Sequence, residues 1–91
     1  MGDKTYRVEI DIRAWQEIMR LGDETQNAVF DAIETLETIP RPSGCKKLKG
    51  EKDIYRIRSG NYRIVYSVHD DILMILIVKV GHRSQIYRKK N

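Results

Sequence analysis

Three arginines stand close together in a segment rich in β-branched and aromatic residues: Arg56, Arg58 and Arg63. The Gly60-Asn61 pair between them tolerates the positive φ angles of a tight turn, so residues 54–69 are predicted to form a β-hairpin. In a two-residue turn Arg58 faces Arg63, and because side chains alternate along a strand, all three arginines share one face. Like charges paired across strands destabilise a hairpin, whereas planar guanidinium groups bind phosphate well. The pattern predicts a face that binds a phosphate-bearing partner.

The charge of the whole chain favours an anionic partner over the alternative that these arginines only improve solubility. Residues 1–44 carry five Lys or Arg and nine Asp or Glu, a net of −4, whereas residues 45–91 carry twelve and four, a net of +8. The basic half is therefore expected to bind nucleic acid. Further binding residues are expected in the loop before the hairpin and in the tail: Lys46, Lys47, Lys49, Lys52, Arg88, Lys89 and Lys90.

The other face of the hairpin is apolar and is expected to form the core. The residues on it are Tyr55, Ile57, Ile64 and Tyr66. Asp70-Asp71 is expected to form a second two-residue turn, followed by an apolar strand over residues 72–80 that is covered on both faces. In that register the core face receives Leu73, Ile75 and Ile77. The arginine side receives Met74, Leu76, Val78 and Val80.

A strand and two helices are predicted before the hairpin. Residues 5–10 alternate in polarity as a strand does, with Tyr6, Val8 and Ile10 on one face. Asp11 is predicted to cap a helix that Gly22 ends, with an apolar stripe of Ile12, Trp15 and Met19, and Ile18 beside it. Asp23, with Gln26 three residues later, predicts the start of a second helix that Pro40 stops. The apolar positions of that helix are Val29, Ala32, Ile33, Leu36 and Ile39.

These elements predict an α+β fold in which a helix pair covers one face of a small, mainly antiparallel sheet, in the order β-α-α-β-β-β with a short C-terminal helix or tail. The 91 residues are expected to form one domain. One cysteine, no apolar run near ~20 residues and no signal-peptide pattern predict a cytoplasmic protein with no membrane partner. The two histidines are isolated, and no Gly-rich phosphate loop follows a strand, so neither a metal site nor a cofactor is expected.

Several short motifs resemble those of the RelE toxins in the RelE/ParE superfamily. They are Leu-Lys-Gly at 48–50, Tyr-Arg-Ile-Arg at 55–58, Asn-Tyr-Arg-Ile-Val-Tyr at 61–66, Val-Gly-His-Arg at 80–83 and Ile-Tyr-Arg at 86–88. The resemblance implies the toxin of a toxin–antitoxin pair. It further implies a metal-independent endoribonuclease that cuts mRNA in the ribosomal A site and is neutralised by a RelB-like antitoxin. The toxin–antitoxin complex, not the toxin alone, would bind operator DNA.

The resemblance also implies which residues act on RNA. They are Arg56, Arg58, Arg63, Arg83 and Tyr87. Some relatives have lysine where this chain has Arg56 and Arg58, and arginine is a poor base because its pKa exceeds about 12. His82, beside Arg83, is therefore the candidate general base or acid.

Two other functions are consistent with the sequence. A ParE-like toxin of the same fold would bind DNA gyrase instead of cutting RNA. A catalytically weak relative would only bind nucleic acid, a reading that the absence of lysine at positions 56 and 58 favours.

Overall fold

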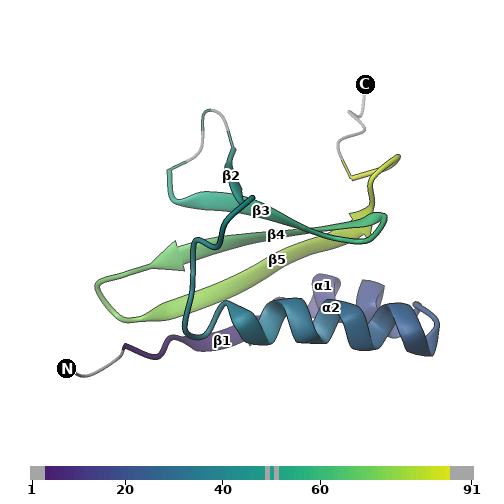
Figure 1. The fold of residues 1–91 in the computed structure, drawn as a ribbon, viewed down its shortest axis with the longest axis horizontal. Helices are drawn as coiled ribbons and strands as arrows, with labels where there is room; N and C mark the ends of the chain where they lie inside the picture. The colour runs from purple at the N-terminus through teal and green to yellow at the C-terminus, as the bar shows by residue number, and fades with distance from the viewer. Residues whose placement is uncertain (1–3, 49, 51, 87–91) are drawn as a thin grey trace.

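The computed structural model describes residues 4–48, 50 and 52–86. Figure 1 shows a twisted sheet with both helices packed on one of its faces. The elements are β1 (Arg7–Ile10), α1 (Ile12–Met19), α2 (Asp23–Thr35), β2 (Lys46–Lys47), β3 (Ile54–Ser59), β4 (Tyr62–His69) and β5 (Met74–His82). The strand order is β1-β5-β4-β3-β2, with β1 parallel to β5 and all other neighbours antiparallel. The predicted α+β architecture is confirmed, and β2 is an additional short strand within the expected loop.

The β3–β4 hairpin has the predicted register. Its cross-strand pairs include Arg58 with Arg63, Ile57 with Ile64, and Tyr55 with Tyr66. Gly60, in the turn, has a φ of 61°, a conformation that glycine adopts without steric cost. The hairpin therefore separates an apolar face, which packs under the helices, from a face that carries the arginines.

The β4–β5 connection differs from the prediction in two ways. His69 pairs with Met74, so a longer loop replaces the two-residue turn, and the register slips by two residues without changing faces. A β-bulge then interrupts the ladder between Val65 and Tyr66. Tyr66 pairs with Ile77 but Val65 pairs with Lys79, which leaves one extra residue on β5.

The bulge exchanges the faces of the last residues of β5. Val80, predicted on the arginine side, lies on the core face and is 2% exposed. Lys79 takes the opposite side, across from Val65. The prediction that β5 is covered on both faces is also wrong, since Met74, Leu76 and Val78 are only partly buried.

The first helix begins as predicted, but of the apolar residues predicted for its buried face only Ile18 is buried. The Asp11 side chain accepts a hydrogen bond from the Arg13 backbone N–H (2.9 Å). The helix buries Ala14 and Ile18 completely, because the small alanine lets the helix lie close to the sheet. The predicted stripe is exposed instead, at 63% for Ile12, 40% for Trp15 and 43% for Met19. The Trp15 ring contacts Phe30 of α2, with 5.9 Å between ring centroids.

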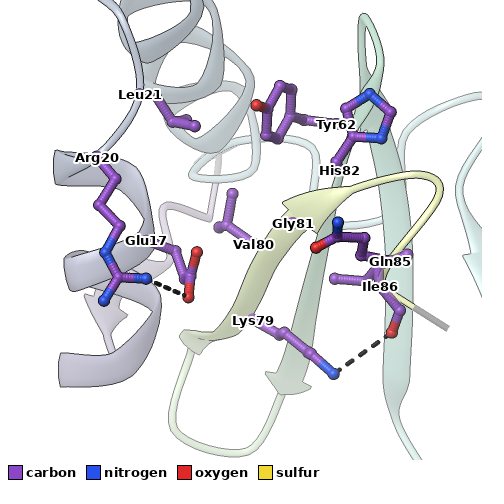
Figure 2. A pocket seen from close by; sticks show the side chains of 10 residues that line it. All are labelled: Glu17, Arg20, Leu21, Tyr62, Lys79, Val80, Gly81, His82, Gln85 and Ile86. Carbon is purple, nitrogen blue, oxygen red and sulfur yellow. Dashed lines mark hydrogen bonds and ion pairs between the residues drawn. The ribbon is translucent and has the colours of Figure 1, made fainter. Parts of the chain in front are cut away.

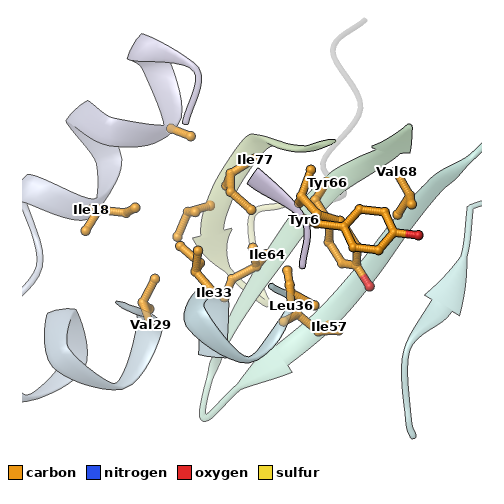
Figure 3. Packing of buried hydrophobic residues seen from close by; sticks show 13 residues of the cluster. Tyr6, Ile18, Val29, Ile33, Leu36, Ile57, Ile64, Tyr66, Val68 and Ile77 are labelled. Carbon is orange, nitrogen blue, oxygen red and sulfur yellow. The ribbon is translucent and has the colours of Figure 1, made fainter. Parts of the chain in front are cut away.

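The second helix is shorter than predicted. Its N-cap is Gly22, with Asp23 as the first helical residue, so the expected capping pair does not form. The Gln26 side chain instead donates to the Ile18 carbonyl (3.1 Å) and joins the two helices. The helix ends at Thr35, and Ile39 is exposed. Figure 3 shows the core between helices and sheet, where Ile18, Val29 and Ile33 of the helices, with Leu36 just after α2, face Ile57, Ile64, Tyr66 and Ile77.

A polar cluster fastens the loop after α2 to the sheet. Arg41 forms an ion pair with Asp70 (Nη2–Oδ2 2.8 Å), and its Nε donates to the Tyr55 hydroxyl (3.0 Å). The Tyr6 hydroxyl donates to Asp70 (2.6 Å), and the Tyr66 hydroxyl donates to the carbonyl of the loop residue before Arg41 (2.7 Å). The hydrogen bonds from Arg41 and Tyr6 lower the pKa of Asp70 to about 2. Asp70 therefore does more than form a turn, because it connects Tyr6 before β1 and Arg41 in the loop to the β4–β5 connection.

Candidate nucleic-acid interface

The sheet face opposite the helices gathers basic side chains from four strands; we call it the arginine face. One cross-strand row runs through Lys46, Arg56, Val65 and Lys79. The next row runs through Arg58, Arg63 and Gly81. Directly opposite residues on neighbouring strands lie only about 5 Å apart, so these cations share one small patch. The predicted convergence of Arg56, Arg58 and Arg63 on one face is confirmed.

Arg63 is anchored to the turn of the hairpin. Its Nη1 donates to the backbone carbonyls of Gly60 (3.3 Å) and Tyr62 (3.2 Å). A guanidinium has five N–H donors, so Nη2 and Nε keep donors for an anion. Arg58 opposite is exposed, and Arg56 is half-buried beside the buried Val65. The patch therefore combines a fixed cation with a freely accessible one.

Arg83 is brought to the same end of the sheet by its backbone. It follows β5, and its N–H donates to the Asn61 carbonyl in the β3–β4 turn (2.7 Å). The Arg83 backbone thus lies beside the turn that anchors Arg63. Its side chain is exposed.

His82 is engaged in a turn. Its Nδ1 accepts the Ser84 backbone N–H (3.1 Å) and lies 2.8 Å from the Ser84 hydroxyl oxygen. Its ring packs edge-on against Tyr62, its cross-strand partner, with 5.4 Å between centroids. By strand alternation this row lies on the helix side of the sheet, with Ile64 and Val80. These contacts are those of a residue that shapes the turn, and a role in proton transfer stays a prediction.

The lysines predicted to bind RNA that the structure describes lie on different faces of the sheet and in a turn. Lys46 pairs with Arg56 on the arginine face, whereas Lys47 pairs with Tyr55 and shares the opposite side. Lys52 is exposed in the turn before β3. The remaining predicted residues, Lys49, Tyr87, Arg88, Lys89 and Lys90, lie outside the described residues.

Lys79 is a basic residue of the arginine face that the sequence pattern did not predict. The expected strict alternation placed it under the helices, and only the bulge turns it outward. A single lysine inside an otherwise apolar strand was the available signal, because a charged side chain there avoids the core only if the alternation breaks.

A hollow of about 330 Å³ lies beside the arginine face, where α1 meets the outer edge of β5. Figure 2 shows its lining, in which Glu17 of α1 forms an ion pair (3.1 Å) with Arg20, the residue after that helix, and Lys79 reaches the Ile86 carbonyl (3.4 Å). Within residues 4–48, 50 and 52–86, no three His, Cys, Asp or Glu side chains are grouped closely enough to hold a metal ion. No helix in that part of the chain is long and apolar enough to cross a bilayer.

Comparisons with known proteins identify the family. The sequence-family model described as ParE toxin of type II toxin–antitoxin system, parDE, matches residues 8–87 of this chain. The mRNA interferase toxin RelE of Escherichia coli strain K12 is 36% identical over 87 residues, which cover 90% of each chain. This chain belongs to the RelE/ParE toxin family.

Solved structures of RelE/ParE toxins share the fold. A chain of the archaeal RelE–RelB complex from Pyrococcus horikoshii OT3 matches with a TM-score of 0.79 at 31% identity, covering 89% of this chain and 98% of that one. A chain of the intact E. coli RelBE toxin–antitoxin complex matches with a TM-score of 0.74 at 32% identity, covering 85% and 95%. The predicted family and architecture are thereby confirmed.

Proposed function

We propose that this RelE/ParE family member is the toxin of a type II toxin–antitoxin system and a metal-independent endoribonuclease that cuts mRNA on the ribosome, in the cytoplasm. One observation carries the proposal: Arg58 and Arg63 face each other on the helix-free side, and the Arg83 backbone is tied to the turn between them. Two cations that repel each other across a hairpin have a functional explanation if a phosphate binds between them and offsets the repulsion. The similar E. coli protein is named an mRNA interferase, which supports RNA as that partner.

The proposed reaction is a transesterification within the RNA. The 2′-hydroxyl loses a proton and its oxygen bonds to the adjacent phosphorus, while the bond to the 5′-oxygen breaks and that oxygen gains a proton. The products are a 2′,3′-cyclic phosphate and a 5′-hydroxyl. Arg63 and Arg83 would donate hydrogen bonds to the non-bridging oxygens as negative charge builds up, an effect worth about 100- to 1000-fold per donor.

The other predicted residues have supporting roles in this scheme. Arg56 and Arg58 would hold the phosphates on either side of the cut, because guanidinium groups bind phosphate oxygens in pairs. Tyr87 would stack on a base, which suits an aromatic ring acting on single-stranded RNA. His82 would shape the turn that carries Arg83. Substituting His82 by asparagine and by glutamine would distinguish this role from proton transfer. Exposed basic side chains, Lys46 and Lys52 among them, would add salt-dependent affinity for RNA.

A RelB-like antitoxin is the proposed protein partner, and operator DNA would be bound only by the complex. The chain offers two features that such a partner would cover. The arginine face is basic, and α1 exposes Ile12, Trp15 and Met19 in one stripe. Replacing Trp15 and Met19 by serine is expected to weaken antitoxin binding while leaving mRNA cutting unchanged. Equal antitoxin binding by that double variant would remove α1 from the proposed interface.

A ParE-like action on DNA gyrase is the second candidate, because the matching family model is that of the ParE toxin. The test adds purified protein to a translating extract and maps mRNA ends by primer extension, alongside a gyrase supercoiling assay. Cuts in translated messages with normal supercoiling are expected. Intact messages with blocked supercoiling would replace the first candidate by the second.

A further inference from the structure

The end of β5 bears an unusual contact between a glycine and the C-terminal segment. Gly81 lies on the arginine face, opposite Arg63. A Cβ built at Gly81 would lie 3.0 Å from Cδ1 of Ile86, closer than real contacts normally are, and Ile86 is 5% exposed. Gly81 is not among the described residues with positive φ, so its backbone conformation does not require glycine. The space at this position is limited by Ile86, whose side-chain end would have to shift by a few tenths of an ångström to admit a Cβ.

Two hydrogen bonds hold Ile86 in the same place. Its backbone N–H donates to the His82 carbonyl (2.9 Å), and its carbonyl accepts from Lys79 Nζ (3.4 Å). Figure 2 shows Lys79 reaching across to this carbonyl. Lys79 is available for the bond because the bulge turns it onto the arginine face. Ile86 is thus fixed through its side chain, its N–H and its C=O.

We propose that Lys79 and Gly81 form a seat for Ile86 that positions residues 83–86 over the arginine face. The seat lies next to Arg63 in the ladder, and the segment it fixes contains Arg83, whose own N–H is bonded to Asn61. Lys79, Gly81 and Ile86 are therefore positioning residues for Arg83, one of the groups proposed to act on RNA. This inference rests on the proposed function.

The seat can be tested by removing and restoring the space above Gly81. Gly81→Ala places a methyl group against Cδ1 of Ile86, and Ile86→Val removes that atom. We expect Gly81→Ala to lower the single-turnover rate of mRNA cutting on ribosomes at least tenfold with little change in KM. Ile86→Val alone should cost a few-fold, and the double variant should recover most of the rate lost by Gly81→Ala. Gly22→Ala is the matched control, because a Cβ at Gly22 meets nothing within 4 Å.

The contribution of Lys79 to the seat can be tested separately. Lys79→Met removes the donor to the Ile86 carbonyl, whereas Lys79→Arg keeps a donor and the charge. We expect kcat to fall several-fold in Lys79→Met and to stay near the wild-type value in Lys79→Arg. An equal loss in both variants, or no loss in Lys79→Met, would overturn its place in the seat.

Hydrogen exchange at the Ile86 and Gln85 amides, in the free protein, gives a readout that does not depend on cutting. The seat predicts faster exchange in Gly81→Ala and slower exchange again in the double variant. Wild-type rates in Gly81→Ala, or a double variant as impaired as the single one, would overturn the seat. If the wild type cuts no mRNA, the proposed function fails, and the exchange rates still decide whether the seat exists.

Discussion

Arg58 and Arg63 are direct cross-strand partners, placed symmetrically about the Ser59–Tyr62 pair that closes the β3–β4 hairpin. Two guanidinium groups at this spacing repel each other, and opposite-charge or apolar pairs there would stabilise the hairpin better. This pair, with Arg56 two residues away on the same face, lowers the stability of the fold at the position where a phosphate would be bound.

This repulsion predicts opposite effects of one substitution on stability and binding. Arg58→Thr should raise the free energy of unfolding by up to about 1 kcal/mol, because it removes the like-charge pair and adds a β-branched residue. The same variant should bind RNA more weakly, with its salt dependence reduced by about one phosphate contact. Arg13→Thr, on α1, is the control and should leave the salt dependence unchanged. A less stable Arg58→Thr variant would show that the pair is stabilising instead.

The Arg41–Asp70 ion pair predicts how stability depends on acid pH. The pKa of Asp70 is lowered to about 2 in the folded protein by Arg41 and Tyr6, below the ordinary value of 3.8. A carboxyl with a lowered pKa contributes stability above its unfolded pKa and loses it as the pH falls through the folded pKa. The difference in unfolding free energy between wild type and Asp70→Asn should therefore be constant above about pH 5 and shrink between about pH 4 and pH 2. Urea unfolding at several pH values measures it, and a difference independent of pH would contradict the ion pair.

The role of His82 can be determined by two substitutions, each of which replaces the hydrogen-bonding group of one ring nitrogen. Asparagine places an acceptor near the position of Nδ1, where His82 receives the Ser84 N–H, whereas glutamine places a polar group near Nε2. If His82 only shapes the turn, His82→Asn should keep activity within a few-fold of wild type and His82→Gln should lose more. Primer extension on ribosome-bound mRNA gives both rates. The reverse order would favour proton transfer through Nε2.

The orientation of α1 can be tested by the same substitution at two positions. Ile18 is fully buried and Ile12 is 63% exposed. Ile18→Ala should cost about 2–5 kcal/mol of unfolding free energy, whereas Ile12→Ala should cost less than about 1 kcal/mol. Chemical denaturation measures both. Similar costs at the two positions would mean that α1 is rotated relative to this structure.

The features that were predictable from the sequence depend on short-range rules. The hairpin register follows from Gly60-Asn61 and from strand alternation, so the pairing of Arg58 with Arg63 could be stated in advance. The cap at Asp11 is equally local. The hairpin part of the candidate site, which carries Arg56, Arg58 and Arg63, is therefore predictable from the sequence.

The errors concern features that long-range packing decides. Periodicity placed Trp15 on the buried stripe of α1, but the helix rotates so that Ala14 can lie against the sheet. The bulge on β5 adds one residue without a glycine or proline to mark it, and so Val80 and Lys79 exchange faces. The C-terminal turn depends on His82, Gly81 and Ile86 meeting in space, which strand alternation does not describe.

The most direct measurement is the single-turnover rate of cutting of an mRNA codon held in the ribosomal A site, for the wild type, Arg63→Lys and Arg63→Ala. We expect Arg63→Ala to fold with wild-type stability to within about 1 kcal/mol and still to bind a RelB-like antitoxin. Its rate should nevertheless fall about 100- to 1000-fold, with Arg63→Lys in between because lysine keeps the charge but not the paired donors. Wild-type cutting by a folded Arg63→Ala variant would contradict the arginine face as the site of RNA cleavage.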